Sequence, residues 1–125
     1  MVVLNPSKNW DRTICIDFDG VIAEYDGWKG SEFFGKPLEG AKDFLMILLS
    51  SNLKVVIFTI RPKEKIIEWF QYYKLPLPQD ITDVKIPAVV YIDDRGLKFN
   101  GDFCSLLNEL KNYHVYWNAQ ERIVI

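Results

Sequence analysis

Residues 13–20 read Thr-Ile-Cys-Ile-Asp-Phe-Asp-Gly. The first part of this stretch is almost entirely apolar and β-branched, which is typical of a strand that is buried on both faces of a parallel sheet. The Asp19-Gly20 pair that follows is a common turn signal. Two later stretches, residues 54–59 and 88–93, have the same apolar character. The sequence therefore predicts three strongly buried strands.

Segments with helical spacing of apolar residues separate these strands. They predict helices over residues 40–51 and 102–112 and another that begins at Pro62. Strands that alternate with helices form a parallel sheet with right-handed crossovers. We therefore expect an α/β fold, a Rossmann-like three-layer sandwich with a mostly parallel sheet, in which residues 1–125 form a single domain.

The rest of the chain has weaker secondary-structure signals. Residues 21–37 are rich in glycine and aromatic residues without a clear period, so we expect a loop or short hairpin there. A short edge strand is expected near residues 81–84, a last strand at 114–117, and a terminal strand within 122–125.

The composition is that of an ordinary globular protein. The chain has 125 residues, of which 49% are hydrophobic, and a formal net charge of -2, which weakens an interpretation as a nucleic-acid-binding protein. No signal peptide or bilayer-spanning run is visible, so we expect a cytoplasmic protein without a membrane partner. Cys15 and Cys104 lie in apolar surroundings and are expected to be core thiols in a reducing compartment.

Polar residues stand at the end of each strong strand. Because ligands bind outside the carboxyl ends of parallel strands, these residues are expected to share one site. They are Asp17, Asp19, Thr59, Arg61, Asp93 and Asp94. Four carboxylates placed side by side repel one another unless a cation neutralises them. A hard cation with oxygen ligands answers this need, and Mg²⁺ suits a site of few carboxylates plus waters and phosphate.

The order of these residues resembles the haloacid dehalogenase-like phosphatase superfamily. Its first motif corresponds to Asp17-Phe18-Asp19-Gly20-Val21-Ile22, its second to the apolar run that ends in Thr59, and its fourth to the run that ends in Asp93-Asp94. The resemblance covers about residues 14–94. It implies a small, capless member in which a short insert replaces the cap domain.

The resemblance also implies a role for each residue. Asp17 would attack phosphorus and form an aspartyl-phosphate, and Asp19 would protonate the leaving oxygen and later activate water. Thr59 would donate its hydroxyl to a phosphoryl oxygen. Asp17, Asp93 and the main-chain carbonyl of Asp19 would bind Mg²⁺, and Asp94 would hold a metal-bound water or orient a cation.

Two basic residues are candidates for the cation that grips the phosphate. The family has a lysine between its second and fourth motifs, and Lys85 has the right order. However, Lys85 precedes the strand whose far end carries Asp93, and an extended strand advances about 3.3 Å per residue. Arg61 stands just beyond the end of its strand, where a guanidinium can bind phosphate with two prongs.

The aromatic loop over residues 25–34 has two interpretations. Its aromatic side chains either form a small hydrophobic cluster, or one of them, Trp28, stacks on a ring of the substrate. The sequence does not separate these alternatives, and it does not give the oligomeric state.

The leading functional hypothesis is a magnesium-dependent phosphomonoester hydrolase that acts on a small phosphorylated substrate. One alternative is a polynucleotide 3′-phosphatase, because Thr59-x-Arg61 with Asp93-Asp94 resembles the pattern of polynucleotide kinase–phosphatase domains and an open site admits a nucleic-acid end. Another is a non-catalytic phosphoacceptor or binding domain of the receiver type. Receivers carry their acidic pair first in the chain and lack a residue equivalent to Asp19.

Overall fold

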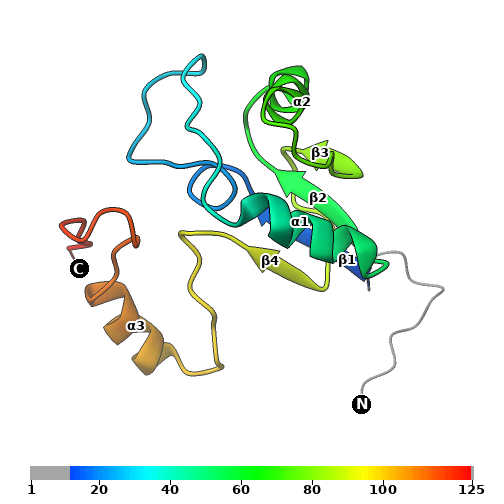
Figure 1. The fold of residues 1–125 in the computed structure, drawn as a ribbon. Coiled ribbons are helices and arrows are strands. Elements are labelled where there is room, and N and C mark those ends of the chain that lie inside the picture. Colours follow the sequence, from blue (N-terminus) through cyan, green and yellow to red (C-terminus); the bar gives the residue numbers. More distant parts are fainter. Residues whose placement is uncertain (1–11, 125) are drawn as a thin grey trace.

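A computed structural model describes residues 12–124 (Figure 1). Its elements along the chain are β1 (Thr13–Asp17), α1 (Ala41–Ser50), β2 (Lys54–Phe58), α2 (Lys63–Tyr72), β3 (Asp80–Thr82), β4 (Val90–Ile92) and α3 (Phe103–Lys111). The four strands form one sheet in the order β3-β2-β1-β4, and every neighbouring pair is parallel. The expected Rossmann-like α/β sandwich is confirmed.

The order of the strands determines where the first two helices lie. From β1 to β3 the chain moves across the sheet in one direction, so right-handed crossovers place α1 and α2 on the same face. That face holds the main hydrophobic cluster, in which Ile16 of β1 and Ile57 of β2 pack with Leu45 of α1 and Phe70 of α2. All four of these side chains are fully buried.

The opposite face of the sheet is covered differently. Cys15 of β1 is paired in register with Tyr91 of β4, so their side chains share this face. The Tyr91 hydroxyl is hydrogen-bonded to the backbone of Ile86 in the segment that returns from β3 to β4. This return segment, rather than a helix, covers the middle of the second face.

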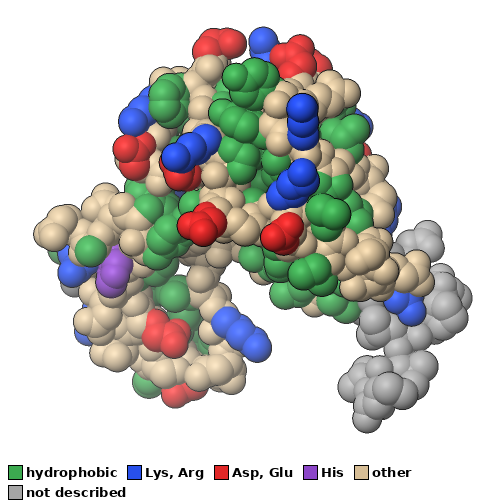
Figure 2. All heavy atoms as spheres, in the orientation of Figure 1, with side chains coloured by type: hydrophobic (Ala, Val, Ile, Leu, Met, Phe, Trp, Pro, Cys, Tyr) green, Lys and Arg blue, Asp and Glu red, His purple; other side chains and the backbone are tan. Residues whose placement is uncertain are grey.

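The C-terminal part of the chain lies beside the sheet. Figure 1 shows α3 away from the strands, and Figure 2 shows the C-terminal part as a lobe with a hollow between it and the main body. None of the α3 residues is buried, and Phe103 is 70% exposed. None of the three helices in the described part of the chain is long and apolar enough to cross a membrane.

Three sequence predictions need correction. Residues 114–117 form no strand; the backbone there makes only an isolated bridge between Val115 and Asn118. Residues 122–124 are not a strand either, and Ile125 lies outside the described residues. Cys104 is exposed on α3, whereas Cys15 is buried as expected, and both thiols are free.

Candidate active site

The carboxyl ends of β2, β1 and β4 bring the expected site residues to one edge of the sheet. Asp17 is level with Phe58, so Thr59 begins the turn beside it. Ile16 is level with Ile92, so Asp93 and Asp94 follow on the other side of β1. The parallel register therefore delivers acidic and hydroxyl side chains from three neighbouring strands to the same place.

A tight turn follows β1 and carries Asp19. The carbonyl of Phe18 accepts hydrogen bonds from the amides of Ile22 and Ala23, both at 3.0 Å. Gly20 lies in the left-handed region with φ 86°, and a Cβ added there would overlap the carboxylate of Asp94. Only glycine combines this backbone conformation with such a close approach.

Asp17 faces the carboxyl group of Asp94. Burial, followed by the hydrogen bond with Asp94 and the charge of Asp94, raises the pKa of Asp17 from 3.8 to about 8. The amide of Phe18, which donates to Asp17 Oδ1 at 3.0 Å, opposes the shift. Without a bound cation, Asp17 therefore keeps its proton near neutral pH.

Asp19 is held by Arg61 in a two-pronged ion pair. Arg61 Nε donates to Asp19 Oδ2 at 2.8 Å and Nη2 donates to Oδ1 at 3.1 Å. The Arg61 side chain is only 2% exposed, and that of Asp19 is 19% exposed. A buried guanidinium that engages both carboxylate oxygens fixes the position of Asp19 more tightly than a lysine would.

The aromatic loop completes the environment of Arg61. The guanidinium carbon lies 4.2 Å from the ring centre of Phe34 and 5.0 Å from that of Trp28, and Nη1 donates to the carbonyl of Ser31 at 3.3 Å. The loop is also tied to α2, where Trp69 donates to the carbonyl of Gly35 at 2.8 Å. Trp28 therefore packs against the guanidinium group of Arg61.

Thr59 and Asp93 are both engaged in local turns. Thr59 is buried, and its hydroxyl oxygen accepts the amide of Arg61 at 3.2 Å. Asp93 Oδ1 accepts the amide of Arg95 at 2.9 Å and also that of Gly96. A cavity of about 360 Å³ is lined by Asp17, Asp93 and Asp94, so part of each residue faces open space.

Lys85 lies apart from this group. It is exposed on the return segment, and its Nζ is 5.7 Å from the ring centre of Tyr91. Among residues 12–124 no hydrogen bond or ion pair joins Lys85 to the strand-end carboxylates. Its role in binding phosphate stays a prediction, and Arg61 is the basic side chain that the fold brings to Asp19.

Two residues of the site were not found from the sequence. Trp117 Nε1 donates to Asp94 Oδ2 at 2.6 Å, and the Tyr116 hydroxyl donates to the carbonyl of Gly20 at 2.6 Å. Both belong to the segment for which the sequence predicts a strand. The available signal was a pair of adjacent aromatic residues, each with a polar group that can donate a hydrogen bond.

Asp17, Asp93 and Asp94 are the carboxylates that could bind a magnesium ion, although they are not arranged as a metal cluster. No group of three or more His, Cys, Asp or Glu side chains within the described range has the geometry to hold a metal ion. Asp19 is turned toward Arg61 and Asp93 toward turn amides, while Asp17 and Asp94 face each other. One or two carboxylates with waters and phosphate are the usual protein contribution to Mg²⁺ binding.

Comparisons with known proteins show the fold alone. No protein-family model matches the chain, and no curated protein matches it. One similar solved structure is described as that of a conserved protein from Bacteroides thetaiotaomicron, with a TM-score of 0.56 and 18% sequence identity. The match covers 90% of this chain and 99% of that chain.

Proposed function

We propose that this chain is a magnesium-dependent phosphomonoester hydrolase of the haloacid dehalogenase-like type, with Asp17 as its nucleophile. The observation that carries the proposal is that Asp17, Asp19 and Asp94 lie close together at the ends of neighbouring parallel strands. Two facing carboxylates repel each other when both are charged, and a bound divalent cation would neutralise that repulsion. Clusters of carboxylates with a strongly raised pKa are typical of functional sites.

In this proposal Asp17 and Asp93 would hold Mg²⁺, which would supply positive charge that stabilises the transferring phosphoryl group and the ionised carboxylates. An oxygen of Asp17 attacks phosphorus, the bond from phosphorus to the leaving oxygen breaks, and Asp19 gives that oxygen a proton. Water then attacks the aspartyl-phosphate while Asp19 takes the proton of the water, which restores Asp17 and releases phosphate.

Arg61 and Thr59 would support these steps. Arg61 holds Asp19 through both oxygens, which fixes the position of the proposed acid/base group. A hydroxyl that accepts one hydrogen bond still has a hydrogen to donate, so Thr59 can accept the Arg61 amide and donate to a phosphoryl oxygen. We assign the local positive charge to Arg61 rather than Lys85, which contacts Tyr91.

The test is turnover of a panel of phosphomonoesters with Mg²⁺, with EDTA, and with Mg²⁺ restored. We expect activity that EDTA abolishes, and no turnover by Asp17→Asn, because an amide is not a nucleophile toward phosphorus. Asp102→Asn is the matched control, because Asp102 caps α3 away from the site and Asn is an equally good N-cap. Undiminished turnover by Asp17→Asn, or turnover that persists in EDTA, would contradict the proposal.

A further inference from the structure

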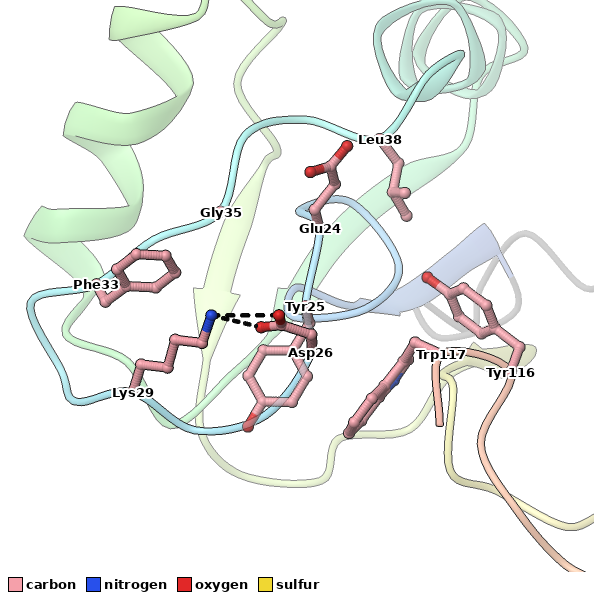
Figure 3. Close-up of a pocket in the computed structure, with 9 residues that line it drawn as sticks. All are labelled: Glu24, Tyr25, Asp26, Lys29, Phe33, Gly35, Leu38, Tyr116 and Trp117. Atoms are coloured by element: carbon pink, nitrogen blue, oxygen red, sulfur yellow. Dashed lines mark hydrogen bonds and ion pairs between the residues drawn. The ribbon is translucent and has the colours of Figure 1, made fainter. Parts of the chain in front are cut away.

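A second cavity lies next to the proposed active site. It has a volume of about 370 Å³ and is formed by the loop after β1 and the segment after α3. Figure 3 shows Phe33 at one end, Tyr116 and Trp117 at the other, and Tyr25 between them. Pockets that bind small molecules begin at about 300 Å³, so this one suits a compact ligand.

Four of the nine residues that line the cavity are aromatic, and some of these rings contact other side chains of the cavity. The rings of Tyr25 and Trp117 meet edge to face with their centres 5.0 Å apart. Lys29 lies 5.0 Å from the ring centre of Phe33 and forms an ion pair with Asp26 at 2.9 Å. The cavity thus combines aromatic walls with charged groups, as Figure 3 shows.

One hydrogen bond connects this cavity to the carboxylates. Trp117 lines the aromatic cavity and donates to Asp94, which lines the other cavity together with Asp17. Tyr116 makes a second connection through the carbonyl of Gly20 in the turn that carries Asp19. A ligand that spans the two cavities would place one end against rings and the other against Asp17.

We propose that the aromatic cavity binds the base of a nucleoside monophosphate whose phosphate lies at Asp17; the substrate assignment rests on the proposed function. Aromatic side chains offer flat surfaces on which any base stacks. The carboxylate of Glu24 and the Lys29–Asp26 pair supply hydrogen-bond partners for the polar edge of a nitrogen heterocycle.

Binding of adenosine, which has no phosphate to hydrolyse, tests the cavity apart from the chemistry. Titration calorimetry should show saturable binding to the full chain, and Phe33→Ala should weaken it by about tenfold, the size of one stacking contact. Phe99→Ala is the matched control: Phe33 is 51% exposed and Phe99 49%, but Phe99 packs on Phe103. Absence of saturable binding, or equal effects of the two substitutions, would overturn the proposal.

Turnover of AMP and of ribose 5-phosphate, which lacks the base, tests the substrate class. We expect kcat/KM to be at least about tenfold higher for AMP, and Phe33→Ala to lower this ratio while Phe99→Ala leaves it unchanged. Equal kcat/KM values would overturn the substrate assignment. Adenosine binding without turnover of any ester would support the base site and contradict the hydrolase proposal.

Discussion

Arg61 links Asp19 to the aromatic loop, so its removal should be costly. Arg61→Met keeps an unbranched side chain between Phe34 and Trp28 but leaves Asp19 without its partner. Breaking a buried pair in this way costs several kcal/mol, and we expect about 3 kcal/mol here because Asp19 keeps some contact with water. Chemical denaturation measures the loss.

The matched control for this substitution is Arg95→Met. Arg95 also forms a two-pronged pair, with Glu121, but its side chain is 52% exposed. Exposed pairs contribute less than about 1 kcal/mol. Equal losses for the two variants would show that the buried pair of Arg61 with Asp19 stabilises the fold no more than an exposed pair does.

The raised pKa of Asp17 predicts how stability depends on pH. Without metal, folded Asp17 keeps its proton up to about pH 8, whereas in the unfolded chain it loses the proton near pH 3.8. Its contribution to the free energy of unfolding is therefore fully present below pH 3.8 and is lost as pH rises toward 8. In EDTA, the Tm of the wild type should fall more steeply from pH 5 to 8 than that of Asp17→Asn. Parallel curves would contradict the shift.

At the residue scale, the sequence predicted which side chains gather but not how they pair. The strand ends determine that Asp17, Asp19 and Asp94 lie together, because the ends of parallel strands share one edge. The pairing of Asp19 with Arg61 depends on the aromatic loop, which has no periodic pattern. For the same reason the sequence left the role of Trp28 open.

Among the elements, α3 should be the least stable helix. It has no buried residue, whereas α2 buries Ile66, Trp69 and Phe70. Segments with few buried apolar contacts open at low free-energy cost. Amide hydrogen exchange should therefore be much faster in α3 than in α2, and measurably slowest in β1, whose first four residues are buried. Equal protection of α2 and α3 would contradict this ranking.

The secondary structure of continuous β-branched runs was predicted well, whereas that of the aromatic segments was not. The three strong strands and the three helices exist close to their expected bounds, because buried strands and amphipathic helices have clear patterns. Residues 114–117 resemble a strand, but Tyr116 and Trp117 instead donate hydrogen bonds to Gly20 and Asp94. Local pattern does not reveal such contacts between residues far apart in sequence.

At the scale of the whole molecule, the topology brings distant segments to one edge of the sheet. The central position of β1 sets Asp17 between the ends of β2 and β4. The aromatic loop contacts the site through Arg61, and the segment after α3 contacts it through Trp117. The sheet thus supplies the carboxylates, and the two irregular segments orient them and form the adjoining aromatic cavity.

The most direct measurement of the central claim is to trap the phosphorylated carboxylate. The full chain is mixed with Mg²⁺ and a phosphomonoester that it hydrolyses and is quenched with borohydride, which reduces an aspartyl-phosphate to homoserine. Peptide mass spectrometry should find homoserine at position 17, and none after EDTA treatment. Phosphate release with no modification at Asp17, or with the modification at another aspartate, would contradict the account.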